Sequence, residues 1–410
     1  MRKSLEQRYL KAILVACVCV VLWLQPAPSL AQEMQTVRAR QLGVPFDGQP
    51  GVLDAITDVA GVEVGSTTLV QGSGPLKVGE GPIRTGVTVV LPRGKEDKDP
   101  VYAGWFSLNG NGEMTGTTWI EEAGLLAGPV GITNTHSVGT VRDTMIAWGL
   151  KHGVVGDDWS LPVVAETFDG FLNDINGFHV KPEHVISALD GAHGGPVAEG
   201  NVGGGTGMVC YGFKGGTGTA SRVIAKELGG YTVGVLVQCN CGRRPQLTVA
   251  GVPVGKEIPD GAPYASLAPG SGPASHSAPL PGSEVEGDVG SIIIVIATDA
   301  PLLPHQLKRL ARRATLGLAR TGSTSGNGSG DIFIAFSTAN HGADRAPGPN
   351  TVLTVANERI SPIFNATVEA TEEAIINAMV GAETMTGRDG HTVNALPHEQ
   401  LQQVLKKYNR

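Results

Sequence analysis

One apolar run constrains the fold of this chain more than any other segment. It lies in the stretch DVGSIIIVIATDAP, residues 288–301, where Ile292–Ala297 contains no polar residue. A strand without polar alternation must be covered on both faces, as happens inside layered α/β proteins. The segment just upstream, PDGAPYASLAPGSGPASHSAPLPGSEVEGDVG, is rich in Pro, Gly and Ser, a composition that does not build a core. A loose segment therefore leads directly into a buried strand.

A cut between Gly290 and Ser291 would explain this arrangement. The segment at about 256–290 would become a flexible tail, and Ser291 would become a new N-terminus at a strand edge. A free α-amine has a pKa of about 8, so it can accept the proton of a hydroxyl on the same residue. Gly290 suits the scissile bond because it does not crowd attack on its own carbonyl. A Gly-Ser step is also a common way to begin a strand, and the residues alone leave both interpretations open.

Clusters of glycine separate apolar strands from helical patterns along the chain. The 58 glycines are about twice the usual share. Strand patterns are TGVTVVLP, VGVLVQCN, SIIIVIATD, IFIAFST and NTVLTVAN, and helical patterns are VGTVRDTMIAWGLKHG, SRVIAKELGG, PHQLKRLARRATLGLART and PIFNATVEATEEAIINAMVG. Their interleaving predicts an α/β fold of layered sheets covered by helices. The run GGGTG at 203–207 matches a dinucleotide loop only weakly, and tight packing turns explain it better.

The first 31 residues are predicted to be a secretory signal. Four basic residues precede the apolar run AILVACVCVVLWL, and the small residues Ser29 and Ala31 stand at −3 and −1 before Gln32. An uncleaved N-terminal anchor is the alternative, although the run is short for a membrane span. We expect a soluble, exported protein in the periplasm, with a mature domain over residues 32–410.

The charge of the mature chain argues against nucleic acid or an anionic membrane as partner. The full chain carries a net charge of −7, and the signal takes +3 with it, which leaves −10. The helix predicted near 302–320 has a basic face opposite its apolar stripe, carrying Lys308, Arg309, Arg312, Arg313 and Arg320. Nucleic-acid binding by this face is one interpretation, but against such an acidic background a solvated or docked helix face is favoured.

Three cysteines remain once the signal, with Cys17 and Cys19, is removed. Because Cys210, Cys239 and Cys241 are odd in number, at least one stays a thiol or pairs between chains. Cys239 and Cys241 are too close in sequence for an ordinary disulfide, and they lack the second ligand pair of a zinc site. The protein is not expected to depend on a disulfide framework.

Four polar residues are candidates for chemistry in a chain without G-x-S-x-G, H-E-x-x-H or P-loop motifs. Ser329 and Asp331 lie two apart as a strand begins and can face one side, unless they only finish a glycine-rich turn. Asn240, between the cysteines, can donate to an oxyanion or simply cap the backbone before Gly242. Glu166 can hold a substrate ammonium or pair with an arginine.

Five long stretches, in this order, give the chain a resemblance to the DmpA/BapA type of peptidase. This family contains L-aminopeptidase/D-amidase–esterases and β-aminopeptidases, and the similarity spans nearly the whole mature chain. The stretches are NGNGEMTGTTWIEEAG, ITNTHSVGTVRD, PVVAETFDGFLNDINGFHV, GSIIIVIATDAPLLPHQLKRLARR and NGSGDIFIAFSTAN.

The resemblance implies a precursor that cleaves itself before the nucleophile Ser291, into an α chain 32–290 and a β chain 291–410 that stay associated. It also implies supporting roles for Ser329 and Asp331, an oxyanion role for Asn240, and binding of the substrate amine by Glu166. Some relatives have Glu at the position of Asp331, and some have Tyr where Phe168 stands beside the substrate.

The family fold is an αββα sandwich, laid out like other N-terminal-nucleophile hydrolases. The expected activity is a serine aminopeptidase acting on short peptides, aminoacyl amides or esters through an acyl-enzyme on Ser291, with no metal or organic cofactor. Relatives assemble as oligomers of the αβ unit, often tetramers. The alternatives are an acyltransferase of the ornithine acetyltransferase type, which normally uses threonine and is intracellular, an inactive relative, and a periplasmic binding protein. The preference for β-, L-α- or D-α-amino acids is not fixed by any motif.

Overall fold

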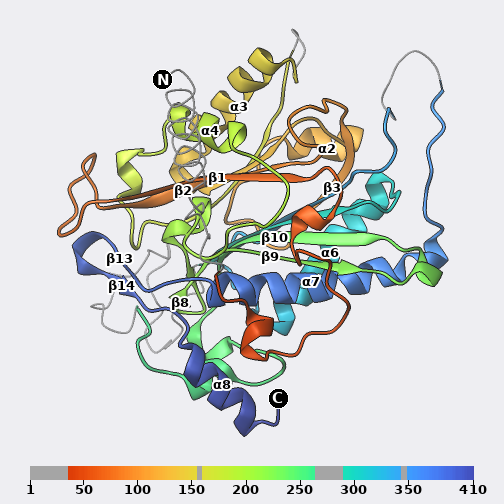
Figure 1. Ribbon diagram of the computed structural model, residues 1–410. Helices are drawn as coiled ribbons and strands as arrows, with labels where there is room; N and C mark the ends of the chain where they lie inside the picture. Colours follow the sequence, from red (N-terminus) through yellow and green to blue (C-terminus); the bar gives the residue numbers. More distant parts are fainter. Residues whose placement is uncertain (1–35, 155–158, 264–289, 343–348) are drawn as a thin grey trace, which may run out of the picture. The chain divides into compact units, whose positions relative to one another are not determined.

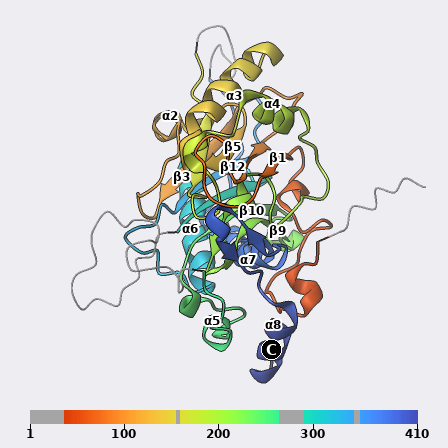
Figure 2. The same cartoon turned by 90° about the vertical axis from the view of Figure 1, so that its left-hand side faces the viewer.

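Two β-sheets lie face to face in the centre of the fold, and helices cover both outer faces (Figures 1 and 2). The computed structural model describes residues 36–154, 159–263, 290–342 and 349–410. The four-stranded sheet has the order β1-β2-β5-β6, with bounds Glu63–Gln71, Ile83–Leu91, Val130–Asn134 and Val163–Thr167. The six-stranded sheet has the order β4-β3-β12-β11-β10-β9, with bounds Leu125–Leu126, Val101–Ser107, Ile332–Ser337, Ser291–Thr298, Thr232–Asn240 and Gly216–Val223.

The strand β11 is buried on both faces, as its unbroken apolar sequence predicts. Ile293, Val295 and Ala297 pack between the sheets, against side chains of the four-stranded sheet such as Val90 and Ile132. The alternate residues of β11 point to the opposite side, into the layer that packs under the helices. Burial of a strand on both faces removes its need for polar alternation.

Each outer face of the sandwich carries a helical layer. α3 (Val138–His152) and α4 (Pro182–Asp190) pack on the four-stranded sheet, and α6 (Pro304–Arg320) and α7 (Ser361–Val380) pack on the six-stranded sheet. Smaller elements surround these layers: α2 (Thr117–Ala123), α5 (Val254–Glu257), α8 (His398–Lys407), and the pairs β7 (Val209–Cys210) with β8 (Phe213–Lys214) and β13 (Met385–Thr386) with β14 (Thr392–Val393). The predicted αββα sandwich is confirmed. None of the described helices is long and apolar enough to cross a membrane.

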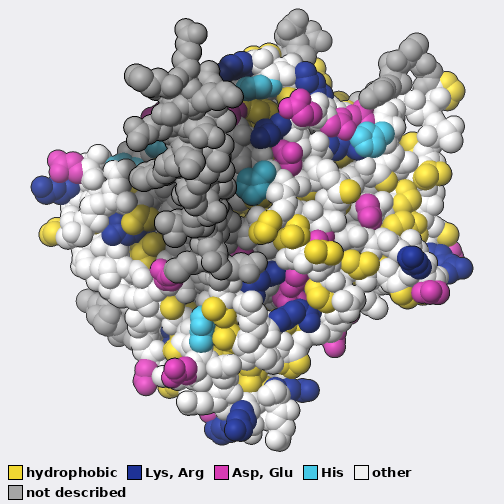
Figure 3. All heavy atoms as spheres, viewed as in Figure 1, with side chains coloured by type: hydrophobic (Ala, Val, Ile, Leu, Met, Phe, Trp, Pro, Cys, Tyr) yellow, Lys and Arg dark blue, Asp and Glu magenta, His cyan; other side chains and the backbone are white. Residues whose placement is uncertain are grey.

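The basic face of α6 docks within the chain. The Lys308 ammonium lies 2.6 Å from a carboxylate oxygen of Glu121. The guanidinium groups of Arg309 and Arg313 lie over the ring of Phe364, and Arg312 lies over another phenyl ring. These contacts fit the interpretation of a docked helix face. Charged side chains of both signs are interspersed on the face of the molecule drawn in Figure 3.

Two of the predicted elements are wrong. Residues 221–230, SRVIAKELGG, are not a helix, because Ser221–Val223 form the end of β9 and only Lys226–Leu228 make a short 3-10 turn. The buried Arg222 explains the difference: its guanidinium lies 2.7 Å from Glu373 of α7, a tertiary contact that local helix propensity does not reveal. The run NTVLTVAN is not a strand either. It leads past the start of α6, where the Gln306 side chain donates to the carbonyl of Val355.

The glycine run at 203–207 is a buried 3-10 turn, which confirms its interpretation as packing. A Cβ on Gly205 would lie 2.2 Å from the main-chain nitrogen of Thr217, so β9 leaves no space for a side chain there.

The predicted tail begins too early at residue 256. α5 ends at Glu257, Ile258 is buried, and Arg244 donates to the carbonyls of Ile258 and Asp260. A buried arginine thus holds the beginning of this segment, although its composition is that of a loose loop. Residues 264–289 lie outside the described residues, as does the predicted signal.

Candidate active site

Ser291 stands at the first position of β11, and the residue is 6% exposed. Its Oγ accepts a hydrogen bond of 3.0 Å from the main-chain N–H of Gly330. The parallel pairing of β11 with β12, which matches Ile293 with Ile332, brings the two residues together. The N–H of Gly330 fixes the position of the oxygen and leaves the hydroxyl proton for another acceptor.

The same register brings Asp331 and Ser329 to the start of β11. Oδ1 of Asp331 accepts the main-chain N–H of Ile292 at 3.2 Å, so the carboxylate lies beside the residue that follows Ser291. The main chain of Asp331 donates to the side chain of Asn109 at 2.6 Å. The Ser329 hydroxyl is buried and has no hydrogen-bond partner among the described residues. An unpaired buried hydroxyl costs free energy, which a ligand or intermediate can recover.

Asn240 lies on the other side of Ser291. It is the last residue of β10 and pairs directly with Ser291 in the antiparallel ladder. Its side-chain Oδ1 accepts the N–H of Val209 at 2.8 Å. This bond orients the amide and leaves the two donors of its nitrogen to serve an oxyanion. The oxygen of Asn240 thus caps a backbone N–H, but one that lies 31 residues away in sequence.

Glu166 comes from the other sheet and is almost fully buried in β6. Its Oε2 accepts the Thr135 hydroxyl at 2.5 Å, and its Oε1 accepts the main-chain N–H of Glu113 at 3.0 Å. Burial raises the pKa of Glu166 above its usual range, and these two hydrogen bonds oppose the shift. No described Lys, Arg or His forms an ion pair with it, so the alternative of an arginine partner is not seen among these residues.

A glycine-rich loop connects Glu166 to the Ser291 end of the site. Gly112 is so close to both that a Cβ there would lie 3.0 Å from the Cα of Gly330 and 3.3 Å from Oε1 of Glu166. Gly330 in turn donates to Ser291. One continuous path of contacts therefore joins the proposed ammonium-binding carboxylate to the proposed nucleophile, across two sheets.

The sequence patterns did not identify several residues that contact Glu166, Ser291 and Asp331. Asn109, Glu113, Thr135 and the main chain of Gly330 were not singled out, although the run NGNGE, residues 109–113, carries the signal. Repeated Asn-Gly steps are typical of a loop that packs its backbone closely against a neighbour.

Phe168 is 36% exposed, just beyond the end of β6, and its ring lies against Gly170. No hydrogen bond or ring contact among the described residues joins it to Ser291. Its exposure leaves an apolar surface two residues from Glu166, and its contact with substrate stays a prediction.

Gly290 occupies a position that only glycine fits. A Cβ there would lie 2.3 Å from the carbonyl oxygen of Asn240 and 2.6 Å from the Cα of Cys241. The residue on the carbonyl side of the predicted cut is thus pressed against the strand that carries the candidate oxyanion donor.

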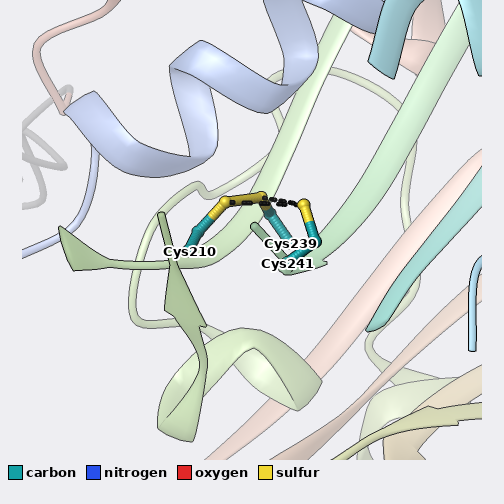
Figure 4. Close-up of side chains that lie close together, drawn as sticks. All are labelled: Cys210, Cys239 and Cys241. Carbon is teal, nitrogen blue, oxygen red and sulfur yellow. Dashed lines mark hydrogen bonds between the residues drawn. A yellow bond between two sulfur atoms is a disulfide. The ribbon is translucent and has the colours of Figure 1, made fainter. Parts of the chain in front are cut away.

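Three buried sulfur atoms lie within 4.8 Å of one another next to Asn240 (Figure 4). Cys210 and Cys239 form a disulfide, and the Sγ of Cys241 lies 3.9 Å and 4.0 Å from their sulfur atoms. Two of the three possible thiolate ligands are therefore occupied by the disulfide bond. The sequence left this pairing open, and it agrees with the expectation that Cys239 and Cys241 do not pair with each other.

The comparison with known families matches residues 54–393 of this chain to Peptidase family S58. The chain belongs to Peptidase family S58. It is 57% identical over 381 residues to a beta-peptidyl aminopeptidase BapA of Sphingosinicella microcystinivorans. The alignment covers 93% of this chain and 94% of that protein. It is 49% identical over 377 residues to a beta-peptidyl aminopeptidase BapA of Sphingosinicella xenopeptidilytica, covering 90% and 91%.

Solved structures give the same assignment. The L-aminopeptidase D-Ala-esterase/amidase of Ochrobactrum anthropi, described as a prototype of the serine aminopeptidases and a variant of the N-terminal-nucleophile hydrolase fold, aligns with a TM-score of 0.81 at 48% identity. The alignment covers 91% of this chain and 99% of that one. A Burkholderia sp. beta-aminopeptidase aligns with a TM-score of 0.78 at 47% identity, covering 90% and 99%. This chain is therefore an aminopeptidase, and neither the acyltransferase nor the binding-protein alternative is favoured.

Proposed function

We propose that this S58 peptidase cleaves itself before Ser291 and then removes N-terminal β-amino acid residues from short peptides, amides and esters. One observation carries the proposal. Ser291 is the first residue of a buried strand, with Asn240 on one side and Gly330 and Asp331 on the other. These are the parts that nucleophilic acyl transfer needs, namely a positioned hydroxyl, an amide donor and a carboxylate.

Self-processing uses the same hydroxyl as turnover. Oγ of Ser291 attacks the carbonyl carbon of Gly290, the nitrogen of Ser291 leaves, and an ester joins the two residues. Water then hydrolyses the ester, which releases the carboxylate of Gly290 and the α-amine of Ser291. The α chain 32–290 and the β chain 291–410 stay associated because β11 of the β chain remains paired with β10 of the α chain, and β12 of the β chain remains paired with β3 of the α chain.

The new amine supplies the base for peptide hydrolysis. With a pKa of about 8 it is partly neutral at pH 7 and accepts the Oγ proton as Ser291 attacks the substrate carbonyl. The amide nitrogen of Asn240 donates to the oxyanion, and the leaving amine takes the proton back. Asp331 balances the ammonium that forms, and Ser329 offers its unpaired hydroxyl to the intermediate. Water then hydrolyses the acyl-enzyme.

Glu166 gives the enzyme its preference for a free N-terminus. A buried carboxylate gains most from an ion pair with the substrate ammonium, and its burial raises its own pKa when no cation is present. The path from Glu166 through Gly112 and Gly330 to Ser291 sets how far the attacked carbonyl lies from that ammonium. The two BapA relatives, named as beta-peptidyl aminopeptidases, support a substrate with one methylene more than an α-amino acid.

Export and assembly complete the proposal. The predicted signal is removed after Ala31, and we expect the mature enzyme to act in the periplasm as an oligomer, a tetramer of αβ units. Its substrates are short peptides, without nucleic acid or membrane as partner.

The test compares hydrolysis of β-homoamino acid, L-Ala and D-Ala p-nitroanilides by the processed enzyme. We expect kcat/KM for the β-homoamino acid substrate to exceed the other two by at least tenfold, and an N-acetylated substrate to be resistant. Equal or greater kcat/KM for an α-amino acid substrate would overturn the β preference while leaving the aminopeptidase activity in place.

A further inference from the structure

The cysteines next to Asn240 form part of a clamp between two short segments. Residues Val209–Tyr211 run alongside Cys239–Cys241, and the two segments are joined three times in succession. The N–H of Val209 donates to the Asn240 side chain, Cys210 is bonded to Cys239, and the N–H of Tyr211 donates to the carbonyl of Cys241 at 2.7 Å. Figure 4 shows the disulfide between the strand of Cys210 and the end of β10.

The Cys210–Cys239 disulfide constrains the Val209–Asn240 hydrogen bond, which lies next to the candidate active site. Val209 is adjacent to Cys210, and Asn240 is adjacent to Cys239, so the disulfide holds the donor and acceptor of the Val209–Asn240 hydrogen bond at one separation. That hydrogen bond is the one that orients the Asn240 amide. Gly290 also packs against the carbonyl of Asn240, which places the clamp beside the proposed cleavage site.

We propose that the Cys210–Cys239 disulfide is a positioning device for the oxyanion donor Asn240, and that its reduction lowers kcat reversibly. The inference rests on the proposed oxyanion role of Asn240. An oxyanion donor acts only if it is preorganised, and loss of one donor costs about 10²–10³ in kcat in enzymes of this kind. An Asn240 amide that is less well positioned, but still present, should lower kcat by a smaller factor.

The redox step uses a dithiol as reductant. One thiolate of the dithiol attacks a sulfur of the Cys210–Cys239 bond, and the second then closes the cyclic disulfide of the reductant. Cys210 and Cys239 gain two electrons and two protons, and the dithiol loses the same number. Both cysteines are fully buried, so reduction requires local opening and is slow in the native enzyme.

The first experiment reduces the processed wild-type enzyme, so that any effect on self-cleavage is already past. We expect kcat to fall about 10- to 100-fold when thiol counting shows that the bond has opened, with KM changed less than twofold. Reoxidation should restore kcat. Unchanged kcat after complete reduction would overturn the inference.

Variants separate this positioning role from general stability. Cys239→Ala removes the disulfide, and Cys241→Ala is the matched control, because it removes a buried sulfur at the same strand end and keeps the bond. We expect a loss of kcat for Cys239→Ala only, measured well below the melting temperature of each protein. Equal losses in both variants would assign the effect to packing.

The Asn240→Ala background separates the inference from the proposed function. If Asn240 is the oxyanion donor, the processed fraction of Asn240→Ala has a lowered kcat, and its reduction causes no further loss. A full additional loss on reduction in this background would contradict the positioning role while the oxyanion role stands. Wild-type kcat in oxidised Asn240→Ala would instead refute the oxyanion role itself.

Discussion

The hydroxyl oxygen of Ser291 accepts the main-chain N–H of Gly330 at 3.0 Å, although 39 residues separate the two in the chain. The contact exists because β11 and β12 pair in parallel and begin side by side. It brings the polar residues before β12 to the first residue of β11, where a free amine appears if the chain is cut. Several consequences of this arrangement can be measured.

Asp331→Asn should lower both kcat and the rate of self-cleavage, by about 10- to 100-fold. In the proposed mechanism the carboxylate, which accepts the N–H of Ile292, stabilises the ammonium form of the Ser291 α-amine, so its loss would lower the pKa of that amine. The acidic limb of the kcat/KM profile should therefore move to lower pH. Asp331→Glu, which keeps the charge, is the control, and a limb that does not move in Asp331→Asn would refute the electrostatic role.

Thr135→Ala should shift the acidic limb of the pH profile of kcat/KM to higher pH, opposite to the effect of Asp331→Asn. The Thr135 hydroxyl donates to the Glu166 carboxylate and holds down a pKa that burial raises. Without it, Glu166 stays protonated to higher pH and binds the substrate ammonium less well, so the acidic limb moves up and KM rises. Thr135→Ser should behave as wild type. A fall in kcat with normal KM would contradict the assignment of Glu166 to ammonium binding.

Gly112→Ala should damage catalysis more than stability. Its Cβ would press on Gly330 and on Glu166, which moves the carboxylate and the nucleophile relative to each other. A misplacement of about 1 Å can cost about 10²-fold, and the smaller shift expected here should lower kcat/KM by about 3- to 30-fold. Gly110→Ala, in the same loop, is the matched control because a Cβ there meets no atom within 4 Å. Equal activity of the two variants would show that the path through Gly112 does not set the geometry.

Lys214→Met should stabilise the protein and flatten part of its pH dependence. The ammonium of Lys214 is fully buried and donates only to the carbonyls of Gly205 and Gly215 in the described structure, and burial lowers its pKa from 10.5 to about 7. Between pH 7 and 10.5 the unfolded chain binds a proton that the folded chain has lost, so the free energy of unfolding rises with pH, by about 1.4 kcal/mol per unit.

Below pH 7 the buried cation is present in the folded protein and costs free energy. Lys214→Met removes that cost, so its free energy of unfolding at pH 7 should exceed that of wild type, and the rise of that free energy above pH 7 should be smaller. Denaturant unfolding at pH 7, 8 and 9 measures both. A slope unchanged in the variant would mean that other groups cause it.

Much of the fold could be predicted because its signals are local. The apolar run of β11 requires cover on both faces, and the long patterns of α3, α6 and α7 are intact helices in the structure. The two wrong predictions of secondary structure, at residues 221–230 and 350–357, lie where contacts with residues distant in the sequence are made. Arg222 lies in a strand that pairs with β10, and its guanidinium contacts Glu373, while Val355 accepts from Gln306 instead of joining a sheet.

The candidate active site could be predicted only in part, for the same reason. Taken singly, Asn240, Glu166, Ser329 and Asp331 each had an ordinary structural explanation, and only the resemblance to a family grouped them with Ser291. Their proximity depends on the parallel register of two strands, the antiparallel pairing of a third, and the loop at 109–114 that reaches between the sheets. No local pattern in the sequence encodes those distances.

Intact mass and N-terminal sequencing of purified wild type and Ser291→Ala test the central claim most directly. The account predicts two chains for wild type, one of them beginning Ser-Ile-Ile-Ile, and one uncut, inactive chain for Ser291→Ala. A wild-type enzyme that is fully active as a single chain would contradict it, because Ser291 would then have no α-amine to act as its base.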